Sequence, residues 1–398
     1  MVDSGLRLSL DVSAVPGRPV GAGQYTLELA GALAARSDVD LVLVARRTDA
    51  PRWRSLSPAD VMARAPDHRP LRLAWEQLRL PGLLRGQHVS VHHGPHYTMP
   101  EWSSVPAVVT VHDLSFFEAP GWHERSKVHL FRRAIAVAAR RAAAVVCPSR
   151  FTAEQLARWC RVDAEVFVAP HGVDTGRFRP DEPRPGADRD CLARLDGRLV
   201  EGRPYLVFVG TLEPRKDVPT LVDAFGRIAE NHPDALLVLA GGPGWGAAEV
   251  DRAVTASGAP DRILRTGYLP DEVVPALLRS TVAAVYPSRY EGFGLPALEA
   301  LACGVPLVTT RGTAMEEVAG DAATLVDPGD VAGLADVLDA HLAGPTGPDP
   351  VQQVRRRRGF DVVAEHTWTA SADRHMEAYR YAVDAGRPRE HDGRPPSQ

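Results

Sequence analysis

The sequence predicts an α/β protein of two domains, each built around a parallel β-sheet. Short apolar runs of strand length alternate with longer segments whose apolar residues recur at helical spacing, and such alternation favours parallel sheets. The alternation occurs twice, and residues 181–203, rich in Pro, Gly, Asp and Arg, separate the two halves as a predicted linker. A chain of 398 residues is long enough for two or three domains.

Residues 1–180 form the first predicted domain. A helix is predicted at 24–36, where Leu27, Ala30 and Ala34 fall on one face. The predicted strands of its sheet are Leu6–Val12, Leu41–Ala45, Val105–Val111, Ala143–Cys147 and Glu165–Ala169. These elements predict a Rossmann-like domain, in which a ligand binds beyond the carboxyl ends of the strands.

Residues 204–365 form the second predicted domain, again Rossmann-like and facing the first across a cleft. Its predicted strands are Tyr205–Val209, Leu236–Ala240, Ile263–Thr266, Val282–Tyr286, Leu307–Thr310 and Ala323–Val326. A last helix is predicted within 366–385, because Trp368, Met376 and Tyr379 recur at helical spacing. The polar tail at 386–398 is predicted to be disordered.

Composition and charge exclude several classes of protein. The net charge of −4 argues against a dedicated nucleic-acid-binding protein. The four cysteines are scattered without the paired spacing of a zinc site. The start of the chain lacks the basic and apolar regions of a signal peptide, and no apolar run reaches the length of a membrane span. We therefore expect a cytoplasmic location.

The first motif that carries chemistry is Gly210–Asp217, directly after the predicted strand at 205–209. The strand ends in Gly210, and Arg215 and Lys216 follow together. Lysine supplies a compact charge and arginine a planar fork of donors, a combination suited to holding a diphosphate. The alternative is a solvated pair of loop cations. Lys216 is one of only two lysines in the chain, which weakly favours the functional interpretation.

The second motif follows the predicted strand at 282–286 and contains Glu291-Gly292-Phe293-Gly294-Leu295-Pro296. The two glycines free the backbone, and Pro296 suits the first turn of a helix. The loop is therefore expected to present N–H groups to phosphate at a helix N-terminus. Glu299, one turn into that helix, is placed to accept hydrogen bonds from a ribose, and Glu291 can reach the group attached to the phosphates. The alternative for both glutamates is a solvated position near a helix start.

With these two motifs in this order, the chain resembles the retaining glycosyltransferases of family 4, which have the GT-B fold. The resemblance spans nearly the whole sequence. It implies that the last helix crosses back onto the first domain and that the diphosphate is bound by cations and helix termini without a metal or other cofactor. It assigns Arg215, Lys216 and Glu291 to the chemistry. The donor-binding loop that it implies contains Gly292, Phe293, Gly294 and Leu295.

The resemblance gives roles to four further positions. Gly21 and Gly23, in the loop before the first helix, would approach the donor diphosphate from the opposite domain. His112 would contact the transferred sugar through its ring or its carbonyl. Tyr268, within Thr266–Leu269, would lie beside the nucleobase. Without the resemblance, an ordinary strand-to-helix turn is the default interpretation of the glycines, and a structural histidine is that of His112.

Two segments of the first domain leave alternatives open. His92, His93 and His96 could gather a metal only with ligands from elsewhere, so a polar loop in the cleft is the preferred interpretation. Arg64–Arg85 mixes arginines with leucines and Trp75, which fits either a packed helix or an amphipathic surface on anionic lipid. The second possibility implies peripheral contact with the inner face of the membrane.

The predicted activity is transfer of a hexose from a nucleotide diphosphate sugar to a hydroxyl of a glycan, a glycolipid or a small molecule. The segments 111–117 and 120–123 are most similar to mannosyltransferases, which favours GDP-mannose as donor. UDP-glucose or another UDP-hexose is the alternative. Other enzymes on the scaffold, an epimerase or a phosphorylase, and a non-catalytic GT-B subunit are further alternatives. The acceptor and the oligomeric state are left open by the sequence.

Overall fold

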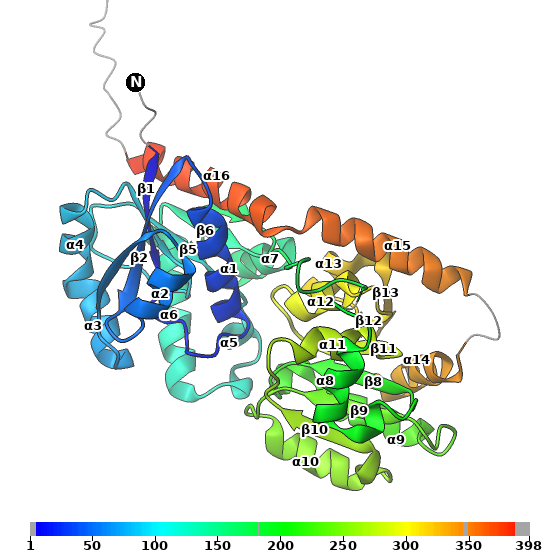
Figure 1. The fold of residues 1–398 in the computed structure, drawn as a ribbon. Helices are drawn as coiled ribbons and strands as arrows, with labels where there is room; N and C mark the ends of the chain where they lie inside the picture. Colours follow the sequence, from blue (N-terminus) through cyan, green and yellow to red (C-terminus); the bar gives the residue numbers. More distant parts are fainter. Residues whose placement is uncertain (1–4, 182, 345–348, 387–398) are drawn as a thin grey trace, which may run out of the picture.

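The computed structural model describes residues 5–181, 183–344 and 349–386, and it contains two α/β domains (Figure 1). The predicted tail, apart from Gly386, lies outside the described residues. The strands of the first sheet are β1 (Leu6–Asp11), β2 (Val39–Arg46), β3 (Asp60–Ala65), β4 (Val91–Gly94), β5 (Ala107–Thr110), β6 (Ala144–Cys147) and β7 (Glu165–Val168). Those of the second are β8 (Tyr205–Val209), β9 (Leu236–Ala240), β10 (Ile263–Gly267), β11 (Ala283–Tyr286), β12 (Leu307–Thr310) and β13 (Ala323–Val326).

Helices surround both sheets (Figure 1). In the first domain they are α1 (Ala22–Ala34), α2 (Ala50–Leu56), α3 (Arg69–Leu78), α4 (Leu80–Gly86), α5 (Ser115–Glu118), α6 (Arg125–Arg141) and α7 (Arg150–Trp159). Beyond it follow α8 (Ala187–Leu195), α9 (Val218–Ile228), α10 (Ala247–Ala256), α11 (Val273–Arg279), α12 (Leu295–Ala302), α13 (Ala314–Ala319), α14 (Val331–Ala343), α15 (Pro350–Glu365) and α16 (Trp368–Gly386). Short 3₁₀ turns occur at Pro120–Trp122, Gly197–Leu199, Pro214–Lys216, Pro260–Arg262 and Gly320–Ala322.

Both sheets are parallel, and in each the strand order reverses beside the first strand of the domain. The orders are β3-β2-β1-β4-β5-β6-β7 and β10-β9-β8-β11-β12-β13. Leu8 of β1 therefore pairs with Leu41 of β2 on one side and with Val91 of β4 on the other. Such a reversal leaves a crevice beyond the carboxyl ends of the two central strands, where α/β proteins bind ligands.

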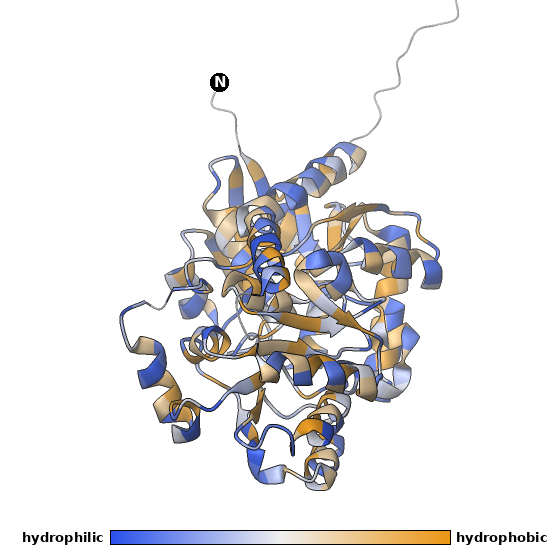
Figure 2. Cartoon of the chain, turned by 90° about the vertical axis from the view of Figure 1, so that its right-hand side faces the viewer, coloured by the Kyte–Doolittle hydropathy of each residue, from blue (hydrophilic) through white to orange (hydrophobic). Residues whose placement is uncertain are grey.

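The strands form the buried core of each domain. Figure 2 shows them largely in the hydrophobic colour, whereas the helices carry both colours. The largest apolar cluster fills the second domain and includes Phe208 and Phe225, both fully buried. The cluster of the first domain includes Leu8, Trp53 and Tyr379, and Tyr379 belongs to α16. The C-terminal helix is therefore part of the core of the first domain, and this confirms that it crosses back.

Three parts of the fold differ from the elements expected from sequence. Strands β3 and β4 were not predicted, because β3 is an edge strand with polar residues and β4 has four residues of which two are histidine. The segment interpreted as a linker contains α8, whose Leu192 packs in the core of the second domain. Its Asp188 forms an ion pair with Arg279 of α11 at 2.6 Å.

A chain of buried hydrogen bonds attaches α16 to the first domain. His375 Nδ1 lies 2.7 Å from Ser371 O, so Nδ1 carries the proton and Nε2 accepts from Tyr25 OH at 2.7 Å. Tyr25 in turn contacts Thr110 Oγ1 at 2.8 Å, and Thr110 contacts His93 Nε2 at 2.8 Å. Tyr379 OH then donates to His93 Nδ1 at 2.7 Å. Each ring is neutral in this arrangement, because each uses one nitrogen as an acceptor.

Candidate active site

The two motifs predicted from sequence meet at the crevice of the second sheet. Gly210–Asp217 follows β8 and the loop at 287–294 follows β11, and these two strands are neighbours at the reversal of strand order. Arg289 N donates to Arg215 O at 2.8 Å, so the backbones of the two loops are joined directly. The topology of the sheet therefore brings together segments about 75 residues apart.

Glu291 lies between the two cations of the first motif. Lys216 Nζ donates to Glu291 Oε1 at 2.7 Å, and Arg215 Nη1 forms an ion pair with Glu291 Oε2. Arg215 Nε also bonds Glu213 Oε2 at 2.8 Å. All three side chains of the Arg215–Lys216–Glu291 cluster are largely buried. Gly210 lies against this cluster, since a Cβ on it would stand 3.4 Å from Lys216 Nζ.

Burial and charge act in opposite directions on the cluster. Burial by itself would raise the pKa of Glu291, but the charges of Arg215 and Lys216 outweigh it and lower that pKa to about 2. Burial would lower the pKa of Arg215, yet Glu291 and Glu213 together raise it. Glu291 is therefore ionised at neutral pH, and it forms ion pairs with both Arg215 and Lys216.

The loop before α12 contacts the first domain through its glycines. A Cβ on Gly292 would lie 1.8 Å from His112 O, so only glycine permits this approach. Gly294 has φ +111°, a conformation that other residues rarely adopt, and it precedes Leu295 at the start of α12. The His112 ring is turned away from the loop, because Nε2 donates to Pro95 O at 2.7 Å. The carbonyl of His112, rather than its ring, therefore faces the loop before α12.

Residues that the sequence did not single out hold this loop in place. Ser149 Oγ and Thr152 Oγ1, at the start of α7 in the first domain, donate to Gly292 O at 2.7 and 2.9 Å. Glu317 of α13 accepts hydrogen bonds from the N–H groups of Arg150 and Phe151, both at 2.8 Å. The second domain thus caps a helix of the first. The pattern Ser-x-x-Thr at a helix start was visible in the sequence, but its partner was not.

Two further predicted residues lie elsewhere in the second domain: Glu299 is on α12, and Tyr268 comes directly after the edge strand β10. Glu299 is half-buried on α12, and burial raises its pKa to about 7 although Arg177 lowers it. Tyr268 follows β10, and the guanidinium of Arg18 lies 5.4 Å from the centre of its ring. The glycine loop of the first domain therefore reaches the position predicted for the nucleobase. Gly21 has φ +51° and directly precedes α1.

Comparison with known proteins identifies the chain. The family model "Glycosyltransferase Family 4" matches residues 19–177, and "Glycosyl transferases group 1" matches residues 194–358. The chain is 30% identical to O-antigen chain mannosyltransferase B of Escherichia coli, over 78% of this chain and 77% of that protein. It belongs to the family 4 glycosyltransferases. It is also 29% identical to the 2-deoxystreptamine glucosyltransferase of Streptomyces kanamyceticus, over 78% of this chain and 81% of that protein.

The fold comparison agrees with the family. The structure superposes on sucrose-phosphate synthase from Thermosynechococcus elongatus with a TM-score of 0.73, at 22% identity, covering 96% of this chain and all of that one. The predicted GT-B fold is confirmed. None of the described helices of this glycosyltransferase is both long and apolar enough to cross a bilayer.

Two expectations about the first domain need correction. His92 and His93 do not lie in a cleft loop, because both are buried on β4. Their ring nitrogens are engaged by Ser9, at 2.7 Å from His92 Nδ1, and by Thr110 and Tyr379 for His93. Gly23 lies within the first turn of α1, where a Cβ would stand 3.3 Å from the rings of Pro16 and Pro19. Its N–H donates to Val20 O at 3.0 Å inside the glycine loop, so this donor is not free for a phosphate.

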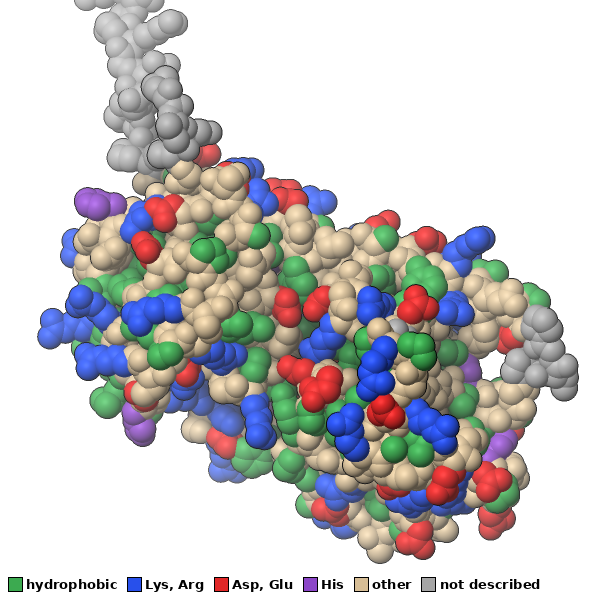
Figure 3. Space-filling view, in the orientation of Figure 1, with side chains coloured by type: hydrophobic (Ala, Val, Ile, Leu, Met, Phe, Trp, Pro, Cys, Tyr) green, Lys and Arg blue, Asp and Glu red, His purple; other side chains and the backbone are tan. Residues whose placement is uncertain are grey.

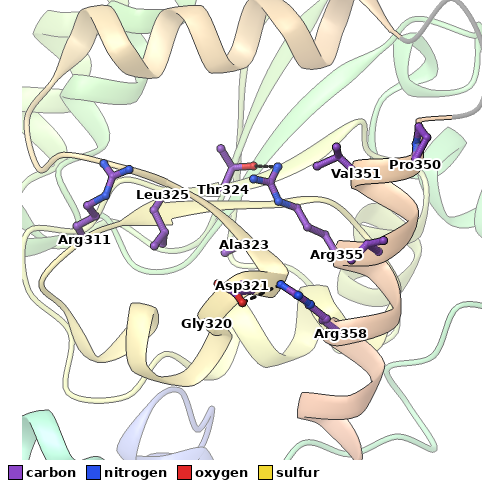
Figure 4. Close-up of a pocket in the computed structure, with 11 residues that line it drawn as sticks. Arg311, Gly320, Asp321, Ala323, Thr324, Leu325, Pro350, Val351, Arg355 and Arg358 are labelled. Carbon is purple, nitrogen blue, oxygen red and sulfur yellow. Dashed lines mark hydrogen bonds and ion pairs between the residues drawn. The ribbon is translucent and has the colours of Figure 1, made fainter.

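A second cavity of the glycosyltransferase lies away from the motifs. It has a volume of about 580 Å³ and lies between β13 and α15 (Figure 4). Its arginines already have protein partners: Arg355 Nη1 donates to Thr324 Oγ1 at 2.8 Å, and Arg358 pairs with Asp321 at 2.7 Å. None of the predicted site residues lines it.

Proposed function

We propose that this glycosyltransferase transfers mannose from GDP-mannose to an acceptor hydroxyl with retention of anomeric configuration. The Arg215–Lys216–Glu291 cluster at the crevice of the second sheet is the observation that carries the proposal. Similarity to the mannosyltransferase of Escherichia coli over most of both chains supports mannose as the transferred sugar. Similarity to a glucosyltransferase over the same share of the chain supports glucose as the second candidate sugar, for which UDP-glucose is the alternative donor.

In the proposed mechanism, the bond between the anomeric carbon and the β-phosphate oxygen breaks, and negative charge collects on the departing diphosphate. Arg215, Lys216 and the N–H groups at the start of α12 stabilise that charge. Glu291 stays ionised because of its low pKa and accepts a hydrogen bond from a hydroxyl of the donor sugar. The acceptor hydroxyl attacks from the same face and gives its proton to the departing phosphate, so the chain supplies no covalent nucleophile.

The donor is tested by titration of the protein with GDP, UDP, GDP-mannose and UDP-glucose, with binding followed as a rise in Tm. GDP and GDP-mannose are expected to raise the Tm, and the Lys216→Ala variant to lose most of that rise. A rise in Tm with UDP and UDP-glucose alone would show that the donor is a UDP-sugar and not GDP-mannose. The anomeric configuration of the product, measured by NMR, tests retention, and a β-mannoside would contradict it.

The proposal includes a cytoplasmic location with peripheral membrane contact through Arg64–Arg85. These residues end β3 and form α3 and α4, and Leu71 and Leu78 of α3 are 62% and 79% exposed. Figure 3 shows basic side chains gathered over the part of the first domain where α3 and α4 lie. Exposed leucines among arginines are typical of a surface that inserts at an anionic interface.

Membrane contact is tested by co-sedimentation with anionic and with neutral phospholipid vesicles. The protein is expected to sediment with the anionic vesicles, and a Leu71→Asp, Leu78→Asp double variant to stay in the supernatant. Both leucines are exposed, so the double variant should fold normally. Equal recovery of wild type and variant with the anionic vesicles would exclude this surface as the site of membrane contact.

A further inference from the structure

The cavity of about 580 Å³ in the second domain is a groove between strand β13 and helix α15 (Figure 4). Ala323, Thr324 and Leu325 of β13 line one side of it, and α15 forms the other side. We call this space the β13–α15 groove. Strand β12 lies between β13 and the crevice at β8 and β11, so the groove is separate from the candidate active site.

β13 is an edge strand, and the outer groups of its backbone are open. Arg311 N donates to Val326 O at 2.9 Å, so the backbone of Val326 faces β12. Successive residues of a strand turn their backbone groups to opposite sides, so Ala323 O and the N–H and C=O of Leu325 face away from β12. Nothing among the residues that the structure describes bonds these three groups. An edge of this kind is a template for another strand.

Three arginines along the groove have donors to spare. For Arg311, Arg355 and Arg358 alike, only Nη1 is hydrogen-bonded to another described residue, which leaves Nε and Nη2 open in that part of the chain. The carboxylate partners, Asp327 of Arg311 and Asp321 of Arg358, are 70% and 81% exposed. Ion pairs so exposed contribute little, so these guanidiniums can bind carboxylates of a ligand at small cost.

Apolar side chains lie between the charged ones. Val351 and Val354, one turn apart on α15, line the groove and are 57% and 51% exposed. Leu325, on the opposite side, is half-buried. The groove therefore offers open backbone groups, cationic side chains and apolar side chains to the same ligand.

This combination selects the chemistry of the ligand. A phosphate or a lipid headgroup accepts hydrogen bonds from arginine, but it has no donor for Ala323 O or Leu325 O. An extended peptide has backbone donors and acceptors, and its side chains alternate between two sides. Acidic residues would complement the arginines. Residues 387–398 of this chain carry three arginines and two carboxylates, so they do not supply that charge.

We propose that the β13–α15 groove docks an extended acidic segment of a partner protein, which adds to β13 as a further strand. The backbone of the segment bonds Ala323 O and the N–H and C=O of Leu325. Its carboxylates pair with the three arginines of the groove, and its apolar side chains contact the two valines. In strand addition the main chain provides affinity and the alternating side chains provide specificity.

The test is fluorescence anisotropy of a labelled peptide, acetyl-Glu-Val-Glu-Val-Glu-Val-Glu, titrated with the full chain. A Kd on the order of 10 μM is expected, since a small interface gives a weak complex. Arg311→Gln and Arg355→Gln each remove one charge from the groove and are expected to weaken the Kd about fivefold. Arg357→Gln removes the same charge from an exposed position on α15 outside the groove, and it should leave the Kd unchanged.

Two N-methylated peptides test whether the ligand is bound as a strand. In a strand the N–H groups of alternate residues point to opposite sides, so methylating the valine amides blocks one side and methylating the glutamate amides blocks the other. One of the two peptides is expected to lose binding by more than tenfold, and the other to bind like the unmethylated peptide. If both bind like the unmethylated peptide, strand addition is wrong.

Four further results would overturn the proposal. They are absence of binding by wild type, equal weakening by all three arginine substitutions, displacement of the peptide by inorganic triphosphate at the same concentration, and a dimer in sedimentation velocity that Arg355→Gln dissociates. The third result would indicate an anion site, and the fourth a second copy of this chain in the groove. Far-UV circular dichroism establishes that each variant is folded. The titration contains no nucleotide or sugar, so its outcome does not depend on the proposed function.

Discussion

Replacement of Lys216 by alanine is expected to lower kcat by about 10²–10³-fold, the loss typical of removing one donor to a developing oxyanion. The reason is its position: Lys216 is buried against Glu291, and with Arg215 it supplies the charge at the crevice of the second sheet. Arg215 keeps its ion pair with Glu291 in the variant, so no buried charge is left without a partner and folding should persist. The measurement is transfer from GDP-mannose under single-turnover conditions.

The other lysine of the chain provides a matched control. Lys127 lies in the first turn of α6, pairs with Glu124 at 3.4 Å and lies 5.5 Å from the centre of the Trp245 ring. An exposed contact of that kind contributes about 0.5–1 kcal/mol, so Lys127→Ala is expected to change kcat by no more than about fivefold. Equal losses in the two variants would show that general loss of positive charge, rather than the position of Lys216, accounts for the effect.

Acidification from pH 6.5 to pH 4.5 is expected to destabilise the protein steeply. Six histidines of the first domain and the interface are buried or half-buried, and burial lowers the pKa of every one: His92, His93, His96, His112, His171 and His375. The value falls to about 3 for His92 and about 4 for His375. In the unfolded chain each histidine titrates near pH 6.5.

The sign follows from these values. Between pH 4.5 and 6.5 these histidines bind protons in the unfolded chain but stay neutral in the folded protein. The part of the free energy of unfolding that they contribute is therefore fully present above pH 6.5 and is lost as the pH falls. Four carboxyls act in the opposite direction, because burial raises the pKa values of Asp11, Glu28, Glu76 and Glu299 in the folded state. The six histidines outnumber the four carboxyls, so unfolding takes up protons in this range and the free energy of unfolding falls as the pH falls.

Urea denaturation at pH 7, 6 and 5 measures this loss. The His375→Gln variant removes one of the six groups, so its stability should fall less steeply with acid although it starts lower at pH 7. His129 is exposed on α6, and His129→Gln should keep the wild-type slope. A denaturation midpoint that is the same at pH 7 and pH 5 would contradict the prediction.

Local sequence patterns determined most of the architecture. Apolar runs of strand length are visible without knowledge of the fold, because a strand buried under helices needs apolar residues on both faces. Tyr205–Val209 and Leu236–Ala240 were predicted with the bounds that the structure shows. The loops around Lys216 and Gly292 could also be recognised, since glycines, cations and a helix-starting proline make a phosphate-binding loop through the backbone of a few consecutive residues.

Tertiary structure alone decided which residues meet. The sequence offered Glu291 as a ligand of the donor sugar, whereas packing of the two loops also makes it the partner of Arg215 and Lys216. His92 and His93 suggested a polar loop, but β4 is central in its sheet and buries them. A cavity beyond the ends of β1 and β4 likewise depends on strand order, which brings Asp11 and Glu76 to line the same space although 64 residues separate them. Such contacts arise from the order of strands and the docking of domains. Neither the strand order nor the docking can be predicted from a local pattern of residues.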